Sequence, residues 1–338
     1  MKFVVATVVI FATLAWANDE SLRGTFLSYQ RRFNKLYASK VEEVRAFEAY
    51  VGNMERAAEL QKQNPHAQFG ETEFTDMPME EFRRTRLNAN IKPNALRAAL
   101  KARPTTRPIG NTTMEWDWRD HGAVTHVKNQ KDCGSCWSFS ATGAMEGQWF
   151  LAGHNLTSLS EQLLVSCDLG LTNYGCNGGA PEFAISWVES KCHGAWTANE
   201  YYPYVSGNGV NPPCKTEVIG NTTMAGAFVD GWELVHDFDE DAMSQWLAAH
   251  GPIGVCLDAE SWNSYQGGVM TSCPGGALDL DHCVLLVGFN RSASTPYWII
   301  KNSWGVHWGE AGYLRVAFGH DLCHLAEVPY APKAGTLP

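Results

Sequence analysis

The residues with the clearest chemical potential stand in the stretch CGSCWSFS, which begins at Cys133. Two cysteines lie two residues apart and are followed by a tryptophan and a run with helical periodicity. Such a pair can be a dithiol redox couple, half of a zinc site, or a disulfide cysteine beside a reactive thiol. The rest of the chain decides among these three kinds of site.

The first two kinds of site need partners that the sequence lacks. A redox pair of the thioredoxin type needs a βαβ setting near the motif, whereas the strand-like segments come much later in this chain. A zinc site needs a second ligand pair at matching spacing, and His320 and His324, which flank Cys323, have no partner motif. We therefore expect neither a metal nor a cofactor.

A reactive thiol needs a base and an orienting group, and distant parts of the chain offer both. Cys136 lies where the loop KDCGS becomes a helix, and a helix N-terminus favours the thiolate. His282 begins an apolar strand, and Asn302 ends another beside Trp304 and Trp308, which can shield it from water. Each residue alone could be a buried cysteine, a surface histidine or a turn asparagine. Together they favour attack by a thiolate on a carbonyl, with proton transfer through an oriented imidazole.

Hydrophobic periodicity predicts the elements that must position these residues. Helical patterns cover two helices within residues 21–63, then 78–86, 138–152, 160–167 and 181–189. The segment 64–76 between them is typical of an extended or turning connector. From about residue 225 onward, short β-branched runs predict strands within 252–259, 282–289, 297–304 and 312–318. A helix-rich half followed by a strand-rich half indicates an α+β fold.

The N-terminus and the cysteines indicate the secretory pathway. Residues 1–17 have the basic residue, the apolar run and the small-x-small site of a secretory signal peptide. All ten cysteines lie between Cys133 and Cys323, which is typical of a disulfide framework in an oxidising compartment. The candidate glycosylation sites fit that compartment and are Asn111, Asn155, Asn221 and Asn290. No later segment has the length and hydrophobicity of a membrane span.

Charge divides the chain into two parts. Residues 18–108 carry 16 Lys and Arg and 12 Asp and Glu, a net of +4, whereas residues 109–338 carry 9 and 24, a net of −15. Opposite charges predict that the two parts attract each other, and the acidic rear part is a poor partner for nucleic acid. Residues 91–109 contain three prolines and little apolar content, which predicts a mobile linker between the two parts.

Five stretches give the chain a family resemblance. CGSCWSFS, LDHCVLLVGF and NSWGVHWGEAGYLRV resemble the papain-type cysteine proteases of the cathepsin L branch, and SYQGGVMTSC and PYWIIKNSW resemble its kinetoplastid members. C-G-[SA]-C-[WY] is an established signature of this family. The resemblance runs from about residue 26 to about residue 330. It implies a cysteine endopeptidase with a papain-like two-lobe fold: a helical left lobe, a β-barrel-like right lobe and an active-site cleft between them.

The resemblance also assigns catalytic roles. Cys136 corresponds to the nucleophile, His282 to the general acid and base, and Asn302 to the residue that orients the imidazole. Gln130 and the Cys136 backbone N–H correspond to the two donors of the oxyanion hole, and Trp304 to the residue that covers the hydrogen bond between histidine and asparagine.

The implied disulfides leave three cysteines over. The family pairs correspond to Cys133–Cys176, Cys167–Cys214 and Cys273–Cys323, with Cys136 free. Cys192, Cys256 and Cys283 remain. Cys283 stands directly after the histidine, where the family usually has Gly or Ala, and Cys256 matches a wall position of the S2 pocket. We hypothesise that Cys256 and Cys283 lie on neighbouring strands, close enough to narrow the S2 pocket or to form an extra bridge. Of the two states of the sulfurs, we expect buried thiols that pack as small hydrophobic groups ahead of a bridge.

The other S2 residues imply an apolar specificity. Ala180 and Pro181 match the walls, and Val328 matches the floor, where some relatives carry a glutamate that accepts arginine. Without a counter-charge, the pocket should prefer Leu, Val or Phe at P2, the substrate residue two positions upstream of the cut. Gly178 and Gly179 should let the substrate backbone approach in extended form.

The front part resembles the family's inhibitory propeptide. The expected domains are therefore a signal peptide (1–17), an inhibitory propeptide with a helical domain and a flexible linker (18–110), and the mature peptidase (111–338). Protonation of carboxylates at low pH should weaken the attraction between the +4 and −15 parts and trigger cleavage near residues 108–112. The expected location is a lysosome or endosome-like acidic compartment, or outside the cell.

The resemblance extends to partners. The expected partners are protein and peptide substrates, the chain's own propeptide and cystatin-type inhibitors, and the mature enzyme should be a monomer without a membrane span. A catalytically impaired homologue that acts as a binding or decoy protein is the alternative function.

Overall fold

The computed structural model describes residues 20–87, 105, 107, 113–170, 172–274 and 280–337. The expected signal peptide, the linker apart from Thr105 and Arg107, the expected domain boundary at residue 110 and Asn111 lie outside the described residues. Among the described helices, none has the length and hydrophobicity needed to cross a membrane.

Helices dominate the first half of the described chain and strands the second, as predicted. After a helix over residues 20–32, the α-helices are α2 (Lys40–Gln63), α3 (Met79–Arg86), α5 (Cys136–Leu151), α6 (Glu161–Cys167), α7 (Pro181–Lys191) and α8 (Glu240–His250). The strands are β1 (Ala67–Phe69), β2 (Glu115–Asp117), β3 (Ala195–Thr197), β4 (Ala225–Leu234), β5 (Ile253–Leu257), β6 (Tyr265–Met270), β7 (His282–Asn290), β8 (Tyr297–Lys301), β9 (Tyr313–Ala317) and β10 (Tyr330–Ala334). Periodicity missed α8, a helix inside the strand-rich half.

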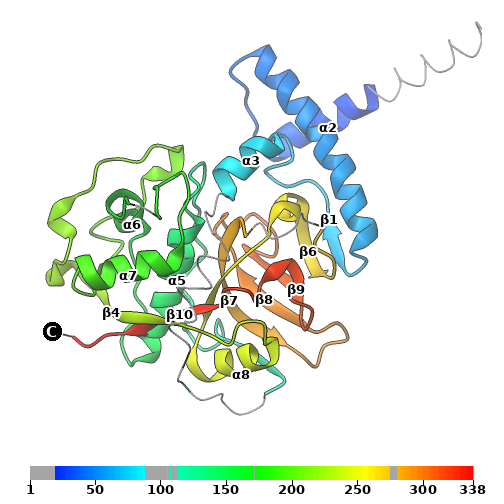
Figure 1. Ribbon diagram of the computed structural model, residues 1–338. Helices are drawn as coiled ribbons and strands as arrows, with labels where there is room; N and C mark the ends of the chain where they lie inside the picture. The colour runs from blue at the N-terminus through cyan, green and yellow to red at the C-terminus, as the bar shows by residue number, and fades with distance from the viewer. Residues whose placement is uncertain are drawn as a thin grey trace, which may run out of the picture.

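The strands form one sheet in the order β1-β6-β9-β8-β7-β5-β10-β4-β3, with β2 paired to β7. Figure 1 shows α5, α6 and α7 grouped on one side of the molecule and β6 to β9 on the other. Each side has its own buried hydrophobic cluster, one around Trp137 and Trp196 and one around Trp262 and Trp298. This arrangement confirms the α+β class and places the junction between the two sides beside α5.

Helix α5 is the central element of this junction. It is buried from Cys136 to Trp149, and it packs against β7 and β10 as well as α7. A Cβ atom at Gly147 would lie 2.9 Å from the Pro252 Cδ atom, so this helix position needs glycine for close packing against the chain before β5. A helix enclosed on all sides holds its first residue, Cys136, in a rigid frame.

The front part of the chain packs on the strand side and reaches the junction. Aromatic residues join the helix over residues 20–32 to α2, with the Phe26 and Tyr50 ring centroids 5.3 Å apart. The predicted connector 64–76 contains β1, which pairs antiparallel with β6 and so extends the sheet. Helix α3 then lies above the junction of the two sides (Figure 1). The sequence predicted α3 within one residue but did not predict the pairing of β1 with β6.

Candidate active site

Cys136 is the first residue of α5, and its thiol is free and fully buried. The preceding loop is fixed by the Cys133–Cys176 disulfide and by the Gly134 backbone N–H, which donates to the Cys176 carbonyl at 3.0 Å. The Cys136 Sγ donates to the Leu87 carbonyl oxygen, 3.4 Å away. The residue after α3 therefore covers the thiol.

His282 and Asn302 meet across the ends of β7 and β8. The Asn302 Oδ1 accepts the Ser303 backbone N–H at 2.8 Å, and because an N–H only donates, this contact identifies the oxygen of the amide. The same Oδ1 lies 2.8 Å from the His282 Nε2, which must therefore carry the proton. The Nδ1 is left as a lone pair, and it has no hydrogen-bond partner among the described residues. This tautomer is the one that can accept a proton from a thiol.

Tryptophans enclose this pair. The Trp304 ring lies 4.9 Å from the His282 ring, centroid to centroid, and Trp262 meets the same imidazole edge-on at 6.0 Å. Trp308 packs on Trp304 with centroids 4.8 Å apart. All of these side chains are buried, so water is excluded from the hydrogen bond between histidine and asparagine.

Gln130 contacts the loop before Cys136 and the front part of the chain, and its amide is oriented by a residue that the sequence analysis missed. The Ser303 hydroxyl donates to the Gln130 Oε1 at 2.7 Å, which turns the Nε2 towards the cleft. The Nε2 donates to the carbonyl oxygens of Cys133 at 3.0 Å and Arg86 at 3.1 Å. Ser303 thus contacts both Gln130 and Asn302. Its place directly after Asn302 was the only signal in the sequence, since the link to Gln130 exists only once the two segments meet.

Burial keeps the thiol and the imidazole neutral in this structure. It raises the pKa of Cys136 to about 12, against hydrogen bonds from nearby backbone groups that lower it. Burial also lowers the pKa of His282 to about 4, although the hydrogen bond to Asn302 acts in the opposite direction. Both shifts favour a neutral thiol and a neutral imidazole while the front part covers the cleft, and the thiolate–imidazolium pair stays a prediction for the processed enzyme.

The front part holds its place in the cleft through polar contacts. Arg86 is largely buried, and it pairs with Asp132 at 2.9 Å and donates to the Lys131 carbonyl. Phe82 packs edge-on against Trp304 with ring centroids 5.2 Å apart. Beyond the cleft, Arg83 pairs with Glu260, and Arg107 with Glu233. In each of these ion pairs the front part supplies the cation and the rear part the carboxylate.

The structure contains four disulfides. Three are the pairs named by the resemblance, Cys133–Cys176, Cys167–Cys214 and Cys273–Cys323. The fourth joins Cys256 to Cys283, whose Cα atoms are 4.0 Å apart, closer than the usual range of about 4.4–6.8 Å. The expectation of two buried thiols is corrected: the two residues are direct partners on β5 and β7. Cys192 stays free and buried.

Most of the residues expected to form the S2 pocket are buried in the hydrophobic cluster around Trp137 and Trp196. Ala180, Cys256, Cys283 and Val328 belong to one buried cluster, and Pro181 begins α7. Trp304 belongs instead to the cluster around the imidazole. Gly178 has φ +104°, which suits glycine, whereas a Cβ atom at Gly179 would lie 2.7 Å from the Trp137 ring. The packing of Trp137 is thus a reason for glycine at 179 that does not involve substrate.

The described glycosylation candidates differ in environment. Asn155 is exposed, and Asn221 and Asn290 are partly exposed. The Asn290 amide donates to the Glu115 carboxylate at 2.8 Å, and the Asn221 Oδ1 accepts the Thr223 backbone N–H at 3.1 Å. Asn155 therefore presents the most accessible side chain of the three.

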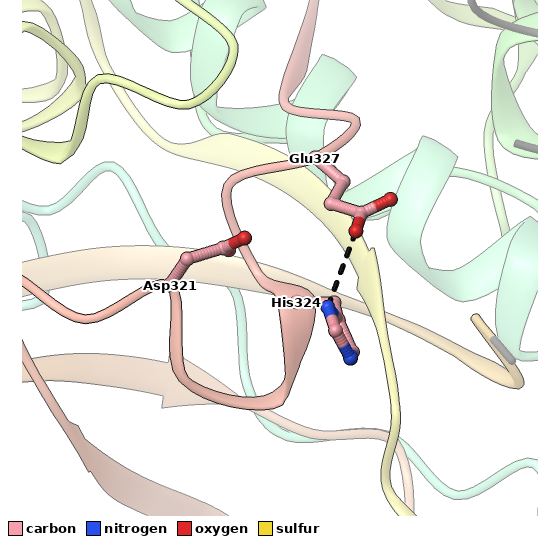
Figure 2. A group of neighbouring side chains, drawn as sticks. All are labelled: Asp321, His324 and Glu327. Carbon is pink, nitrogen blue, oxygen red and sulfur yellow. Dashed lines mark ion pairs between the residues drawn. The ribbon is translucent and has the colours of Figure 1, made fainter. Parts of the chain in front are cut away.

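Among the described residues, one group of three could offer ligands to a metal ion: Asp321, His324 and Glu327, whose ligand atoms lie within 4.8 Å of one another. Figure 2 shows that His324 points to Glu327, and their Nδ1 and Oε1 atoms are 3.1 Å apart. The Asp321 Oδ1 already accepts the Ala326 backbone N–H at 2.7 Å. The three side chains are therefore used within the loop before Val328: His324 pairs with Glu327, and Asp321 closes a turn with Ala326.

Comparisons with known proteins agree with this architecture. Residues 112–333 match the family described as papain family cysteine protease, and residues 26–82 match the cathepsin propeptide inhibitor domain (I29). Cysteine proteinase B of Leishmania mexicana is 45% identical over 309 residues, which cover 90% of this chain and 67% of that protein. Cysteine proteinase A of the same organism is 42% identical over 304 residues, 89% of this chain and 83% of that protein. The solved structure of digestive procathepsin L2 from Tenebrio molitor matches with a TM-score of 0.79 and 28% identity, over 92% of this chain and 99% of that one.

Proposed function

Because the chain belongs to the papain family of cysteine proteases and carries a cathepsin propeptide inhibitor domain, we propose that it is an acid-activated endopeptidase zymogen with Cys136 as nucleophile and His282 as acid and base. The observation that carries the proposal is the Asn302-oriented imidazole together with a free thiol that a front-part carbonyl caps. The four residues Cys136, His282, Asn302 and Gln130 then act as one catalytic unit.

The reaction follows from the positions of the protons. Once the front part leaves, the Cys136 thiol passes its proton to the His282 Nδ1, and the thiolate attacks the substrate carbonyl carbon. The Gln130 Nε2–H and the Cys136 backbone N–H donate to the resulting oxyanion. The imidazolium then protonates the leaving amine, and a thioester remains. Water attacks the thioester while His282 takes its proton, and the acid product leaves with Cys136 restored as a thiol.

Inhibition follows from the same contacts. The Gln130 Nε2 donates to the Arg86 carbonyl, and the Cys136 thiol to the Leu87 carbonyl, so backbone of the front part occupies both reactive positions. Opening the cleft restores solvation of the thiol, which removes the main cause of its raised pKa.

Acid should weaken the grip of the front part. The described ion pairs across the interface join Arg83, Arg86 and Arg107 to carboxylates of the rear part. Acid protonates carboxylates across the rear part and so lowers its net charge of −15, while the arginines of the front part stay charged. Processing of the purified zymogen, followed by gel electrophoresis at constant ionic strength, should therefore be faster at pH 4.5 than at pH 7, with a new N-terminus near residues 108–112. Equal rates would contradict acid activation.

The buried walls support an apolar P2 preference. Ala180, Val328 and the Cys256–Cys283 bridge present no charge, so an arginine in this pocket would lose its hydration without gaining an ion pair from them. A peptide library should show faster turnover of Leu, Val or Phe than of Arg at P2. Comparable turnover of Leu and Arg would contradict this part of the proposal.

We propose a secretory route to an acidic compartment or to the exterior, with protein substrates and cystatin-type inhibitors as partners and a monomeric mature form. The four bridges support an oxidising folding compartment.

Irreversible labelling tests the central claim. A thiol-directed peptide epoxide should label the acid-processed protein at Cys136, and Cys136→Ala should abolish both label and turnover. Cys192→Ala is the matched control, because Cys192 is the other free and buried cysteine of the described chain. Gln130→Ala should retain the label but lower kcat by roughly 10²- to 10³-fold. A processed protein that neither labels nor cleaves would instead support the binding or decoy homologue.

A further inference from the structure

The strand that carries His282 has a single neighbouring strand at that point in the described sheet. Leu257 pairs with His282, and Cys256 with Cys283, whereas pairing of β7 with β8 begins only at Leu285. The residue before the histidine also depends on the same neighbour, since the Asp281 backbone N–H donates to the Leu257 carbonyl at 3.0 Å. The end of β7 is thus anchored mainly to β5.

The Cys256–Cys283 bridge fastens this end. Successive side chains of a strand point to opposite faces, so His282 lies on the tryptophan side while Cys283 lies in the buried cluster with Val328. The same end of β7 packs on α5, where the Ser140 hydroxyl donates to the Val284 carbonyl at 2.7 Å. The bridge therefore ties the strand that carries His282 to β5, next to the helix that carries Cys136.

We propose that the Cys256–Cys283 disulfide is a positioning device for catalysis, which holds the His282 imidazole in register with the Cys136 sulfur after the front part has left the cleft. This inference rests on the proposed function. In the zymogen, the thiol is also held by Leu87 and the cleft by Arg86. In the processed enzyme those contacts are gone. The His282 imidazole is then held in place only by Asn302, by the surrounding tryptophans and by the strand to which it belongs.

Two bridge-free variants and one control test this role. Cys256→Ala/Cys283→Ala removes the bridge, and Cys256→Val/Cys283→Val removes it while filling the space with a β-branched pair. Cys167→Ala/Cys214→Ala removes a bridge from the helical side instead. Each acid-processed protein is assayed with a Leu-P2 peptide from pH 4 to 8, and rates are divided by the active sites titrated with the epoxide.

Both bridge-free variants should lose roughly 10- to 100-fold in kcat per titrated site, because a small misplacement of reacting groups has that effect. Their KM for the Leu-P2 peptide should change too, because the bridge is part of the proposed S2 wall, so positioning is judged by kcat per titrated site and by a shift of the acidic limb of kcat/KM, which follows the coupling of imidazole and thiol. The control should lower Tm but leave kcat and the pH profile unchanged. A purely structural bridge would behave like the control.

The Val pair separates the covalent link from packing. If it restores the kcat and the pH profile of the natural enzyme, packing suffices and the proposal is overturned. Unchanged kcat in both variants overturns it too, and so does peptide mapping of the processed enzyme that finds Cys256 and Cys283 as thiols. If the unaltered chain itself shows no label and no turnover, the failure belongs to the proposed function.

A measurement on the unaltered chain keeps the proposal testable if the variants do not fold. Graded dithiothreitol reduces the bridge to two thiols and is itself oxidised to its cyclic disulfide. Bridge occupancy, measured by mass spectrometry, should fall together with kcat per titrated site. A constant kcat while the bridge disappears would overturn the proposal.

Discussion

The molecule buries glutamates in two opposite ways. Beneath the active site, Glu146 and Glu161 accept hydrogen bonds from the Lys128 Nζ at 2.7 and 2.5 Å, and Lys301 joins the group through Thr125. At the start of α7, Glu182 is fully buried, and neither carboxylate oxygen has a partner among the described residues. All three carboxyl groups lose hydration on burial. Ion pairs and hydrogen bonds compensate this loss at Glu146 and Glu161, but not at Glu182.

The difference appears in the protonation states. Burial opposes ionisation of Glu146, but Lys128, Lys301 and the hydrogen bonds outweigh it, and the pKa of Glu146 is lowered. At Glu182, burial raises the pKa to about 8. We conclude that Glu146 is a carboxylate and Glu182 a neutral acid at the acidic pH at which the enzyme should work. Burial alone thus does not predict the charge of a group; its partners do.

The largest loss of stability should come from removing a charge from the buried group formed by Glu146, Glu161, Lys128 and Lys301. Glu146→Gln leaves the buried Lys128 and Lys301 with less negative charge, and loss of one partner of a buried pair destabilises a protein by about 3–5 kcal/mol. The measurement is urea unfolding at pH 6 in a Cys136→Ala background, which prevents processing. Glu200→Gln, at an exposed position, is the control and should change little. A loss below 1 kcal/mol for Glu146→Gln would mean that the lysines are solvated after all.

An intermediate effect, of opposite sign, should come from Glu182→Gln. The folded pKa of about 8 lies above the ordinary value of 4.5, so the contribution of this group is fully present below pH 4.5 and is lost as the pH rises through 8. Glutamine does not titrate. The variant should therefore match the parent near pH 4.5 and exceed its unfolding free energy at pH 8.5, with about 5 kcal/mol as the upper limit that the full shift sets.

Urea unfolding of both proteins at pH 4.5, 6.5 and 8.5 checks this sign. Glu189→Gln, on the same helix but partly exposed, serves as the matched control and should leave the pH dependence unchanged. If the unfolding free energies of the parent and of Glu182→Gln fall in parallel as the pH rises, the prediction is contradicted. Such a result would show that the ionised Glu182 gains a partner or contact with water.

The two regions also show what a sequence can predict. Cys136, His282 and Asn302 could be proposed because each begins or ends a predicted element and because together they supply a nucleophile, a base and an orienting group within stretches that carry a family resemblance. Glu182 could not, because an acidic residue in the first turn of a helix is favoured by the helix dipole and is normally exposed. Its burial depends on how α7 packs against β4.

Register and most long-range contacts could not be predicted. A bridge between Cys256 and Cys283 could be named as a possibility, but neither strand's pattern fixes its alignment to the other, so the sequence did not decide between a bridge and two thiols. Ser303 orients Gln130 across 173 positions of the chain. Most of the long elements were predictable from local periodicity, although α8 was not, whereas these contacts follow from tertiary packing.

The smallest effect should come from an ion pair that water reaches. Arg83 and Glu260 pair across the interface with 52% and 37% of their side chains exposed, so solvent already compensates both charges. Arg83→Gln should weaken the hold of the front part by about 0.2–1 kcal/mol, which corresponds to processing at pH 5.5 that is faster by less than about fivefold. The increase in processing rate should be smaller in 0.5 M salt because salt screens the ion pair of the parent protein.

Lys62→Gln is the control, since Lys62 pairs with Glu59 inside α2 and does not cross the interface. If processing of Arg83→Gln is a hundredfold faster, this exposed ion pair is as strong as the buried group around Lys128. In that case the exposure of a charged side chain would not predict how much its ion pair stabilises the protein.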